Sequence, residues 1–481
     1  MLGAAALLLS VNPLGYFGGR WDDGRYFEAA WAWAAGPVLG LDHWALRWPV
    51  VLPAAGAIRA LGVTRDALAV PGLLTLAALL AINFWAARRV WGGGVATLFC
   101  LALLTTPELL HAAPRLTADL PELLFWSAAL WAFWFGRDGS RGWLLAAGIA
   151  SGLAWATRET SLGLLLLLAL AFVAGRGAPR TGYVWIALGF ATVTLPEMLA
   201  LWSASGDPLY RLHVDLHHID IPSTNLAGLT APGATAPLNI ALMARWSGDG
   251  PLRLHWAIDP WLNLFANPVY GLNFLLAAIG AVWLRRQLRW PVLLVAAIVA
   301  LNVVTVTYLI ATDPKPRMFM PATVAAALLL ALVAGLLWQH GHRRVVLAAG
   351  VVKLIAALVL LDVATSYAGL PALARAALAV APGPVHVDRW SASHLVVADP
   401  AVRRRLSLVS ARPGDLYLTI GKLADYTGSD APQPGARWQQ LWRGHGQLPL
   451  TVRVVQALGM ARDYRYPALY VTLYRRLPDA L

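Results

Sequence analysis

The residues best suited to chemistry lie in a short acidic segment near the N-terminus. Asp22 and Asp23 are adjacent, and Tyr26 follows three residues later. A carboxylate at a water–lipid boundary needs only a modest rise in pKa, caused by desolvation and a like-charged neighbour, to accept a proton near neutral pH. The same aspartates could instead cap an interfacial helix by binding its backbone N–H groups. The segment therefore predicts either a general base or a helix cap.

Cationic residues suited to phosphate contacts follow at three places along the chain. Arg47 stands four residues after His43, and Arg317 directly precedes an apolar stretch. Arg158 and Glu159 separate two apolar stretches with almost no loop between them. A guanidinium group presents a planar fork of donors that matches phosphate oxygens. The structural alternatives are an interfacial ion pair for Arg158 and Glu159 and a snorkelling side chain for Arg317.

Two further polar features accompany these residues. Asp119 opens an apolar stretch, where an aspartate suits the helix dipole as an N-cap. A long loop later in the chain holds two histidines four residues apart, so that one helical face could hold a metal. We favour a polar lid over a metal site for this loop, whose polar residues are His213, Asp215, His217, His218 and Asp220.

Membrane-spanning helices must position these residues, because the chain is too apolar for a soluble enzyme. Hydrophobic residues make up 58% of its 481 residues and charged residues only 13%, against about 25% charged in a soluble domain. The low charge also excludes a mainly disordered chain. The single cysteine, Cys100, excludes a disulfide framework and a cysteine-rich zinc site. The net charge of +13 forms no compact basic tract, so we expect no nucleic-acid partner.

The apolar stretches are long enough to cross a membrane, which takes about 20 residues. Alternate connections carry arginine pairs or triplets, which predicts that these connections are cytoplasmic. We expect a multi-pass protein of the bacterial inner (plasma) membrane with a cytoplasmic N-terminus and long outer-face loops at 18–66 and 204–267. Eleven spans are expected, at roughly 2–17, 67–87, 94–110, 119–136, 142–157, 161–175, 183–203, 268–284, 290–311, 318–338 and 345–367.

The C-terminal part of the chain differs from the rest in its turn residues and its short β-prone runs. Pro382, Gly383 and Pro384 interrupt the chain. Short β-prone runs then alternate with charged turns, which is typical of a small α/β domain. We therefore expect a transmembrane domain at 1–370 and an extracytoplasmic soluble domain at 382–481, with strands at 395–397, 416–420, 450–455 and 469–473.

The order of the polar motifs resembles the GT-C superfamily of membrane glycosyltransferases, in particular glycosyltransferase family 39 and the ArnT-like group. That family carries roughly Asp-Glu-x-x-Tyr followed by His/Arg-x-Pro in one loop, where this chain has Asp22-Asp23-Gly24-Arg25-Tyr26 and then Arg47-Trp48-Pro49. Arg158-Glu159 stands where the family often has Lys-Gly or Lys-Glu. The stretch 313–321 is similar to the family's Arg-Tyr-x-x-Pro element, shifted by about a residue. The resemblance covers about residues 1–370.

This resemblance implies a mainly α polytopic membrane protein, GT-C-like with about 11 transmembrane helices, followed by a small soluble α/β C-terminal domain. It implies an enzyme that moves a hexose or pentose from a polyprenyl-phosphate-linked donor to a hydroxyl of an acceptor lipid, glycan or protein on the extracytoplasmic face. The resemblance fixes no cofactor and leaves a divalent cation open. Asp119 would either orient the acceptor or bind such a cation.

The resemblance also assigns expected roles. Asp22 would be the general base, with Asp23 and Asp119 as the other catalytic carboxylates. The donor phosphate would be bound by Arg47, Arg158 and Arg317, and substrate contacts would come from Tyr26, His43 and Glu159.

Two other functions compete with this one. A transporter or lipid flippase would place its charges within the spans, often in broken helices, whereas here the polar residues gather on one predicted face. A scaffold or sensor whose outer domain binds a partner would show no activity and no dependence on Asp22.

Overall fold

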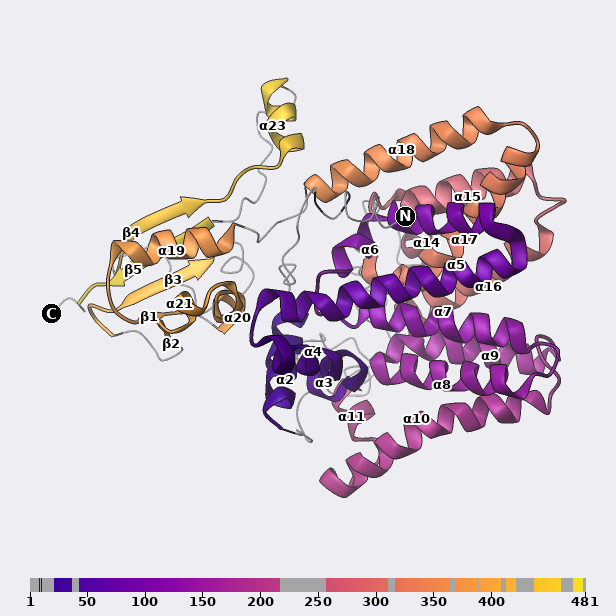
Figure 1. Cartoon of the computed structure of the whole chain (residues 1–481), viewed down its shortest axis with the longest axis horizontal. Helices are drawn as coiled ribbons and strands as arrows, with labels where there is room; N and C mark the ends of the chain where they lie inside the picture. The colour runs from indigo at the N-terminus through magenta and orange to yellow at the C-terminus, as the bar shows by residue number, and fades with distance from the viewer. Residues whose placement is uncertain are drawn as a thin grey trace.

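The structure is a computed structural model. The residues that it describes are Leu8, Ser10, 21–36, 43–216, 257–309, 316–363, 369–387, 389–407, 412–420, 437–459 and 470–478. Within these ranges it is a bundle of helices with an α/β unit at one end (Figure 1).

Short helices alternate with long apolar ones in the first part of the bundle. The helices up to residue 216 are α2 (Trp21–Ala35), α3 (His43–Leu46), α4 (Trp48–Leu61), α5 (Arg65–Leu104), α6 (Pro107–Ala112), α7 (Asp119–Gly136), α8 (Arg141–Thr157), the 3-10 helix η1 (Glu159–Ser161), α9 (Leu162–Val173), α10 (Gly182–Ser205) and α11 (Tyr210–Leu216).

The second part of the bundle contains one bent helix pair and three long helices. Its elements are α14 (Asp259–Ala266), α15 (Gly271–Trp283), α16 (Arg289–Val303) with a π-helical extension η2 (Val304–Leu309), the 3-10 helix η3 (Pro316–Phe319), α17 (Met320–Gln339) and α18 (Arg343–Asp362).

Among the described residues, five helices are long and apolar enough to cross a membrane, or six if the bent pair α14–α15 counts as one span. The expected segments from 67 onward fall on helices, but α8 and α9 have only 17 and 12 residues, and α14 and α15 meet at 93°. The first expected span, 2–17, lies almost wholly outside the described residues. The number of eleven spans therefore stays a prediction.

Helix α5 contains two of the expected spans in one continuous run. Its 40 residues would extend about 60 Å if straight, but Gly92 has φ 86°, a conformation that glycine adopts without steric cost. The Cys100 thiol donates to the Leu80 carbonyl at 3.6 Å across 20 residues of sequence. A contact between residues that far apart requires the helix to fold back on itself, so α5 is an antiparallel hairpin that turns at Gly92.

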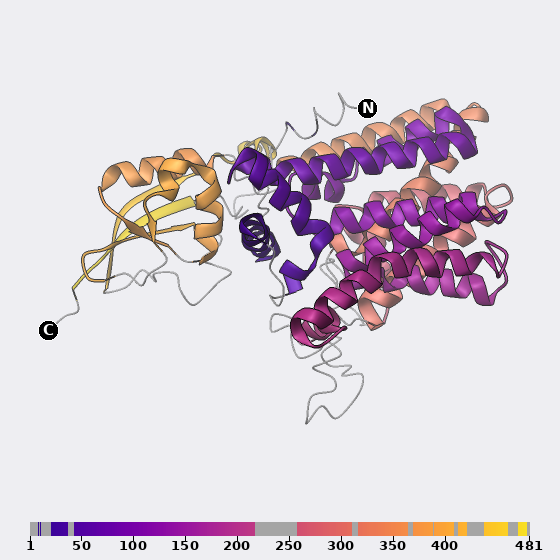
Figure 2. The same cartoon turned by 60° about the horizontal axis from the view of Figure 1, so that its bottom comes forward.

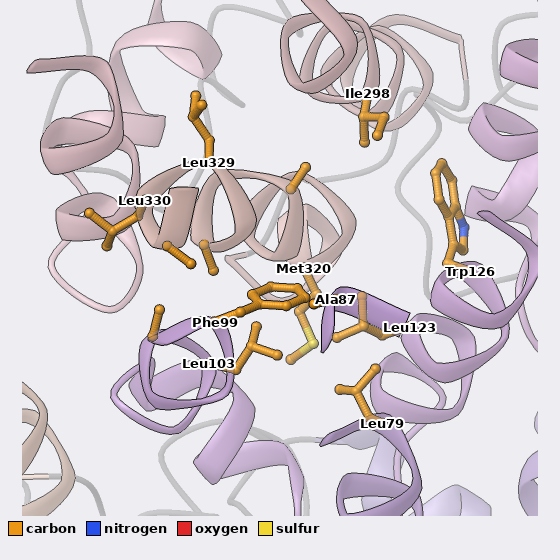
Figure 3. Packing of buried hydrophobic residues seen from close by; sticks show 14 of the residues in the cluster. Leu79, Ala87, Phe99, Leu103, Leu123, Trp126, Ile298, Met320, Leu329 and Leu330 are labelled. Atoms are coloured by element: carbon orange, nitrogen blue, oxygen red, sulfur yellow. The ribbon is translucent and has the colours of Figure 1, made fainter. Parts of the chain in front are cut away.

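The hairpin of α5 and the helices α7, α16 and α17 enclose the main core. Figure 3 shows Phe99 and Leu103 of α5 next to Met320 of α17, with Leu123 of α7 nearby. Small residues let other helices approach closely: an added Cβ on Gly148 of α8 would lie 2.0 Å from the Ile186 carbonyl oxygen of α10. Close packing of this kind is the main source of helix association in lipid.

The two ends of the bundle differ in chemistry. Arginines from four of the five predicted cytoplasmic connections lie above indole rings, at 4.5–5.7 Å: Arg89 with Trp85, Arg137 with Trp134, Arg141 with Trp185, Arg176 with Trp290, and Arg343 with Trp338. Because α7 runs from Asp119 to this end and α8 returns from it to Arg158, the polar residues singled out above lie at the opposite end.

The α/β unit lies beyond that opposite end (Figures 1 and 2). Its sheet has the strand order β2-β1-β3-β5-β4, in which β1 pairs in parallel with β2 and β3, and the other pairs are antiparallel. Its elements are α19 (Leu370–Val380), β1 (Val385–His386), α20 (Arg389–Ala398), α21 (Pro400–Arg403), β2 (Leu406–Ser407), β3 (Leu416–Ile420), β4 (Trp438–His445), α23 (Leu450–Ala457) and β5 (Tyr470–Arg476).

The expected strands are right in two places and wrong in two. Strands β3 and β5 coincide with the runs at 416–420 and 469–473. The runs at 395–397 and 450–455 are instead in helices α20 and α23, because short apolar runs do not distinguish a strand from a helix. Helix α19 shares its core with the strands, so this unit begins at Leu370, before the expected boundary at 382.

Candidate active site at one end of the bundle

Carboxylates and guanidinium groups alternate in a chain of contacts at this end of the bundle. Arg317 of η3 forms an ion pair with Asp22 in the first turn of α2. The Nε atom of Arg317 is also 3.9 Å from Oδ1 of Asp119. Asp119 in turn pairs with Arg158. Four residues from four separate parts of the sequence therefore form one connected charge network.

Helix ends bring these residues to the same level. Asp119 is the first residue of α7, and Arg158 follows the last residue of α8, which is antiparallel to α7. Arg158 has an extended backbone (φ −164°, ψ 141°), so α8 ends there and the Arg158 side chain is not part of the helix surface. The Asp119–Arg158 pair is buried, with side chains 3% and 7% exposed, whereas Asp22 is 29% and Arg317 19% exposed. Solvent therefore reaches the Asp22–Arg317 pair.

A second branch of the network runs through Arg47, just before α4. Its guanidinium donates to the Tyr26 hydroxyl at 2.8 Å and to Oε2 of Glu159 at 2.7 Å. Burial raises the pKa of Tyr26, so its phenol stays protonated and serves as a hydrogen-bonding group. These contacts fix α2 and α4 to the junction between α8 and α9.

Trp44 and the groups packed on its ring contact the Asp22 carboxylate. The Trp44 indole N–H donates to Oδ1 of Asp22 at 3.4 Å. His43 lies against the Trp44 ring with centroids 3.7 Å apart, and the Arg25 guanidinium is 5.2 Å from its centroid. His43 therefore supports Trp44, and Trp44 supports Asp22.

Sequence reasoning missed a carboxylate next to Asp119. Glu122 is 4% exposed and accepts hydrogen bonds from the hydroxyls of Thr160 (2.6 Å) and Ser161 (2.9 Å). Residues three apart lie on the same side of a helix, so the spacing of Asp119 and Glu122 was the available signal. Glu122 fixes η1, and through it the position of Arg158.

A further ionic group extends the network toward α10, and of its members sequence reasoning named Asp215 but missed Arg211 and Glu197. Arg211 of α11 donates to Glu197 of α10 at 2.9 Å and lies 3.8 Å from Asp215. Asp215 also lies 3.8 Å from Arg47. Burial, with the nearby Glu159 carboxylate adding to it, raises the pKa of Asp215 to about 7. The carboxyl group of Asp215 therefore titrates in the physiological range.

The candidate phosphate-binding arginines have unused donors. The Nε–H groups of Arg47, Arg158 and Arg317 are buried and have no hydrogen-bond partner within the described part of the chain. An unpaired buried donor costs about 1–3 kcal/mol. Each of these groups can therefore gain from an added acceptor such as a phosphate oxygen.

The predicted site residues thus come together at this end of the bundle. Asp23 is 3% exposed beside Asp22, and all nine predicted residues lie in or beside the network. The N-cap alternative for Asp119 is wrong, since its carboxylate caps no backbone N–H group and pairs with Arg158. Arg317 pairs with Asp22, and the snorkelling alternative for it stays a prediction.

The predicted metal pair has only one described member. His213 lies 2.6 Å from Oδ2 of Asp207, whereas His217, His218 and Asp220 fall outside the described residues. In the described ranges, no group of three or more His, Cys, Asp or Glu side chains is arranged to hold a metal ion.

An apolar cavity of about 580 Å³ begins close to the network and extends through the bundle. Its lining includes Trp126, one turn after Glu122, and Pro321, four residues after Arg317. At the other end it is lined by Trp91, Arg176 and Trp290, which belong to the arginine-rich end. The cavity therefore runs along the helices between the level of Trp126 and Pro321 and the arginine-rich end.

Comparisons with known proteins agree with this architecture. Residues 38–202, about a third of the chain, match the family model for dolichyl-phosphate-mannose-protein mannosyltransferases. The ArnT structure from Cupriavidus metallidurans bound to undecaprenyl phosphate matches with a TM-score of 0.57 at 15% identity, covering 98% of this chain and 96% of that one. The apo-form Archaeoglobus fulgidus oligosaccharyltransferase matches with a TM-score of 0.51 at 14% identity, covering 84% of this chain and 63% of that one.

A search of curated protein sequences finds no match. The family model and the two solved structures confirm the resemblance to the GT-C membrane glycosyltransferases. At 14–15% identity, the structural likeness is one of fold.

Proposed function

We propose that this protein is a GT-C glycosyltransferase that moves a sugar from a polyprenyl-phosphate-linked donor to an acceptor hydroxyl on the extracytoplasmic face. The observation that carries the proposal is the Asp22–Arg317–Asp119–Arg158 network, which lies at the end of the bundle away from the arginine–tryptophan contacts. A carboxylate accessible to solvent stands there beside guanidinium groups, which is what this transfer requires.

Arg317 is the proposed contact for the donor phosphate. It is the more exposed of the cations in the network, and its guanidinium is shared between Asp22 and Asp119. The phosphodiester anion of the donor would compete with Asp22 for this guanidinium by charge-assisted hydrogen bonds. The buried Arg158 and Arg47 add positive charge close behind it, and their unpaired Nε–H groups support the same role.

Asp22 is the proposed general base. Its carboxylate pairs with Arg317, and donor binding to Arg317 would release that carboxylate for catalysis. The acceptor oxygen would then form a bond to the anomeric carbon while the bond from that carbon to the phosphate oxygen breaks. Asp22 takes the acceptor proton, and Arg317 neutralises the charge that grows on the leaving phosphate.

The remaining predicted residues would organise this centre. Asp23 adds negative charge beside Asp22, and Asp119 holds both Arg158 and Arg317 in place. Tyr26 and Glu159 orient Arg47, and His43 supports Trp44 against Asp22. The apolar cavity that starts at Trp126 and Pro321 is the proposed site of the isoprenoid chain.

The proposed location is the bacterial inner membrane with the N-terminus in the cytoplasm. The arginine-rich connections would face the cytoplasm by the positive-inside rule, so that the network and the α/β unit would face outward. A transporter is the competing function. It is disfavoured because the described ionic network lies at helix ends.

The decisive experiment uses the purified full chain in lipid nanodiscs and in sealed vesicles. Radiolabelled polyprenyl-phosphate sugars of several kinds are supplied together with an envelope lipid and glycan extract as the acceptor mixture. The proposal expects label on an acceptor, release of polyprenyl phosphate, and loss of both in Asp22→Asn. Movement of intact donor across the vesicle membrane, without label on any acceptor, would assign the protein to the transporters.

A further inference from the structure

Helix α23 of the α/β unit leaves a row of large apolar side chains uncovered. Leu450, Val454 and Leu458 are 61%, 47% and 66% exposed. Residues four apart stand above one another on a helix, so these three form one stripe. Arg453, also exposed, lies at the edge of that stripe, and Val452 on the other side of the helix is buried. The helix is therefore amphipathic, and its apolar side has no partner among the described residues.

A residue of the bundle fixes where this helix begins. Pro449 precedes α23 and has no side chain that can cap it. Asp362, the last residue of α18, caps it instead: its carboxylate accepts from the backbone N–H groups of Leu450 (3.3 Å) and Thr451 (2.6 Å). The two segments are 88 residues apart in sequence, so this contact attaches the α/β unit to the end of a long apolar helix.

Helix α18 carries an exposed apolar surface. α18 is one of the helices long and apolar enough to span a membrane, and Val351, Val352 and Ile355 on it are 53–56% exposed. Figure 1 shows α23 at the outer end of α18, at the periphery of the molecule, lying across the direction of the bundle helices. An amphipathic helix that lies at the end of a membrane-spanning helix and across its direction has the geometry of an interfacial helix.

We propose that α23 is a membrane-surface anchor that inserts Leu450, Val454 and Leu458 into the lipid–water interface and holds the α/β unit at the bilayer. The partner is the phospholipid surface itself. The exposed apolar surface of α18 extends to Val359, one turn before the Asp362 that caps α23, and Arg453 at the edge of the stripe can reach lipid phosphates. Interfacial helices of this kind bury their apolar side about 5–10 Å into the headgroup–acyl boundary. The proposal goes beyond the proposed catalytic function and does not depend on it.

The experiment places single labels on α23 in the full chain. Cys100 is buried and is the single cysteine, so Cys100→Ala gives a background without thiols. Val454→Cys and Leu458→Cys carry an environment-sensitive fluorophore on the stripe, and Gln456→Cys, exposed on the polar side, is the matched control. Each labelled protein is reconstituted in phosphatidylcholine–phosphatidylglycerol nanodiscs with or without brominated lipids.

Brominated lipid is expected to quench the labels at 454 and 458, whereas aqueous iodide quenches the label at 456. Asp362→Ala is expected to reduce lipid quenching at 454 and 458, because it removes the cap that fixes the helix at the membrane level. Quenching of all three labels by iodide alone overturns the proposal. So does protection of 454 and 458 that is equal with and without brominated lipid, which would indicate a protein partner such as a second copy of the chain.

Discussion

Arg317 and Asp22 form an ion pair although 295 residues separate them in the sequence. One residue lies in the short 3-10 helix before α17, and the other in the first turn of α2. The pair joins α2 to the start of α17, and through Asp119 it is connected to the α7–α8 hairpin. The candidate site therefore exists only when the whole bundle has assembled.

Replacing Asp22 with Asn is expected to abolish transfer, since the amide has the same shape but cannot take a proton. Loss of a general base costs about 10²–10⁴-fold in rate. The measurement is kcat with the purified protein, together with donor binding, which should persist. Asp66→Asn, an exposed aspartate in the first turn of α5, is the matched control and should keep normal turnover. Near-normal turnover in Asp22→Asn would remove Asp22 from the role of base.

Replacing Arg317 with Ala is expected to weaken donor use. The loss of one charge-stabilising donor should cost about 2–4 kcal/mol in the transition state, which is roughly 30- to 1,000-fold in kcat/KM. Arg317→Lys should recover part of this loss, because it keeps the charge but not the planar fork. Kinetics against donor concentration test the prediction, and an unchanged kcat and KM in Arg317→Ala would reduce this arginine to a structural role.

The buried Asp119–Arg158 pair is expected to behave as a unit. Arg158→Met should destabilise the fold by about 3–5 kcal/mol, because it leaves the Asp119 carboxylate buried without its cation. The double variant Asp119→Leu with Arg158→Met should recover much of that stability, since it removes both charges. Thermal unfolding in detergent measures both effects, and simple additivity of the two single losses would argue against coupling.

Asp215 should make stability depend on pH. Burial raises the pKa of Asp215 to about 7 in the folded chain, against about 3.9 for an unfolded aspartate. Its contribution to stability is therefore complete below about pH 3.9 and is lost as the pH rises through about 7. Between pH 5 and 8 the melting temperature of the native protein should fall more steeply than that of Asp215→Asn, because the amide at position 215 does not titrate. Parallel slopes for the two proteins would contradict this.

Two glycines should respond in opposite directions to the same change. A Cβ on Gly189 of α10 would lie 2.2 Å from the Leu145 carbonyl oxygen of α8, so Gly189→Ala must separate these helices at a cost of about 1–3 kcal/mol. Gly350 within α18 faces open space, and Gly350→Ala should stabilise the helix by about 0.5–1 kcal/mol. Melting temperatures of the two variants, measured side by side, test this contrast. Equal effects would mean that α8 and α10 do not pack this closely.

The sequence by itself determined the class of the molecule and the identity of its candidate site residues. Apolar stretches of membrane-spanning length can only be helices in lipid, since every backbone group must be satisfied within the segment. The composition therefore indicated a polytopic helical protein, and the expected segments from 67 onward fall on helices. The polar residues at their ends, such as Asp119 and Arg158, stood out because charges are costly near a membrane core.

Only the tertiary structure decided how these residues pair. Nothing in the local sequence indicates that Arg47 bonds Tyr26 and Glu159, or that Asp362 caps a helix 88 residues further on. The helix at 450–457 was misread as a strand for the same reason, because its cap and its packing come from distant segments. Periodicity and composition report local preferences, whereas ion pairing and capping depend on which helix ends meet in space.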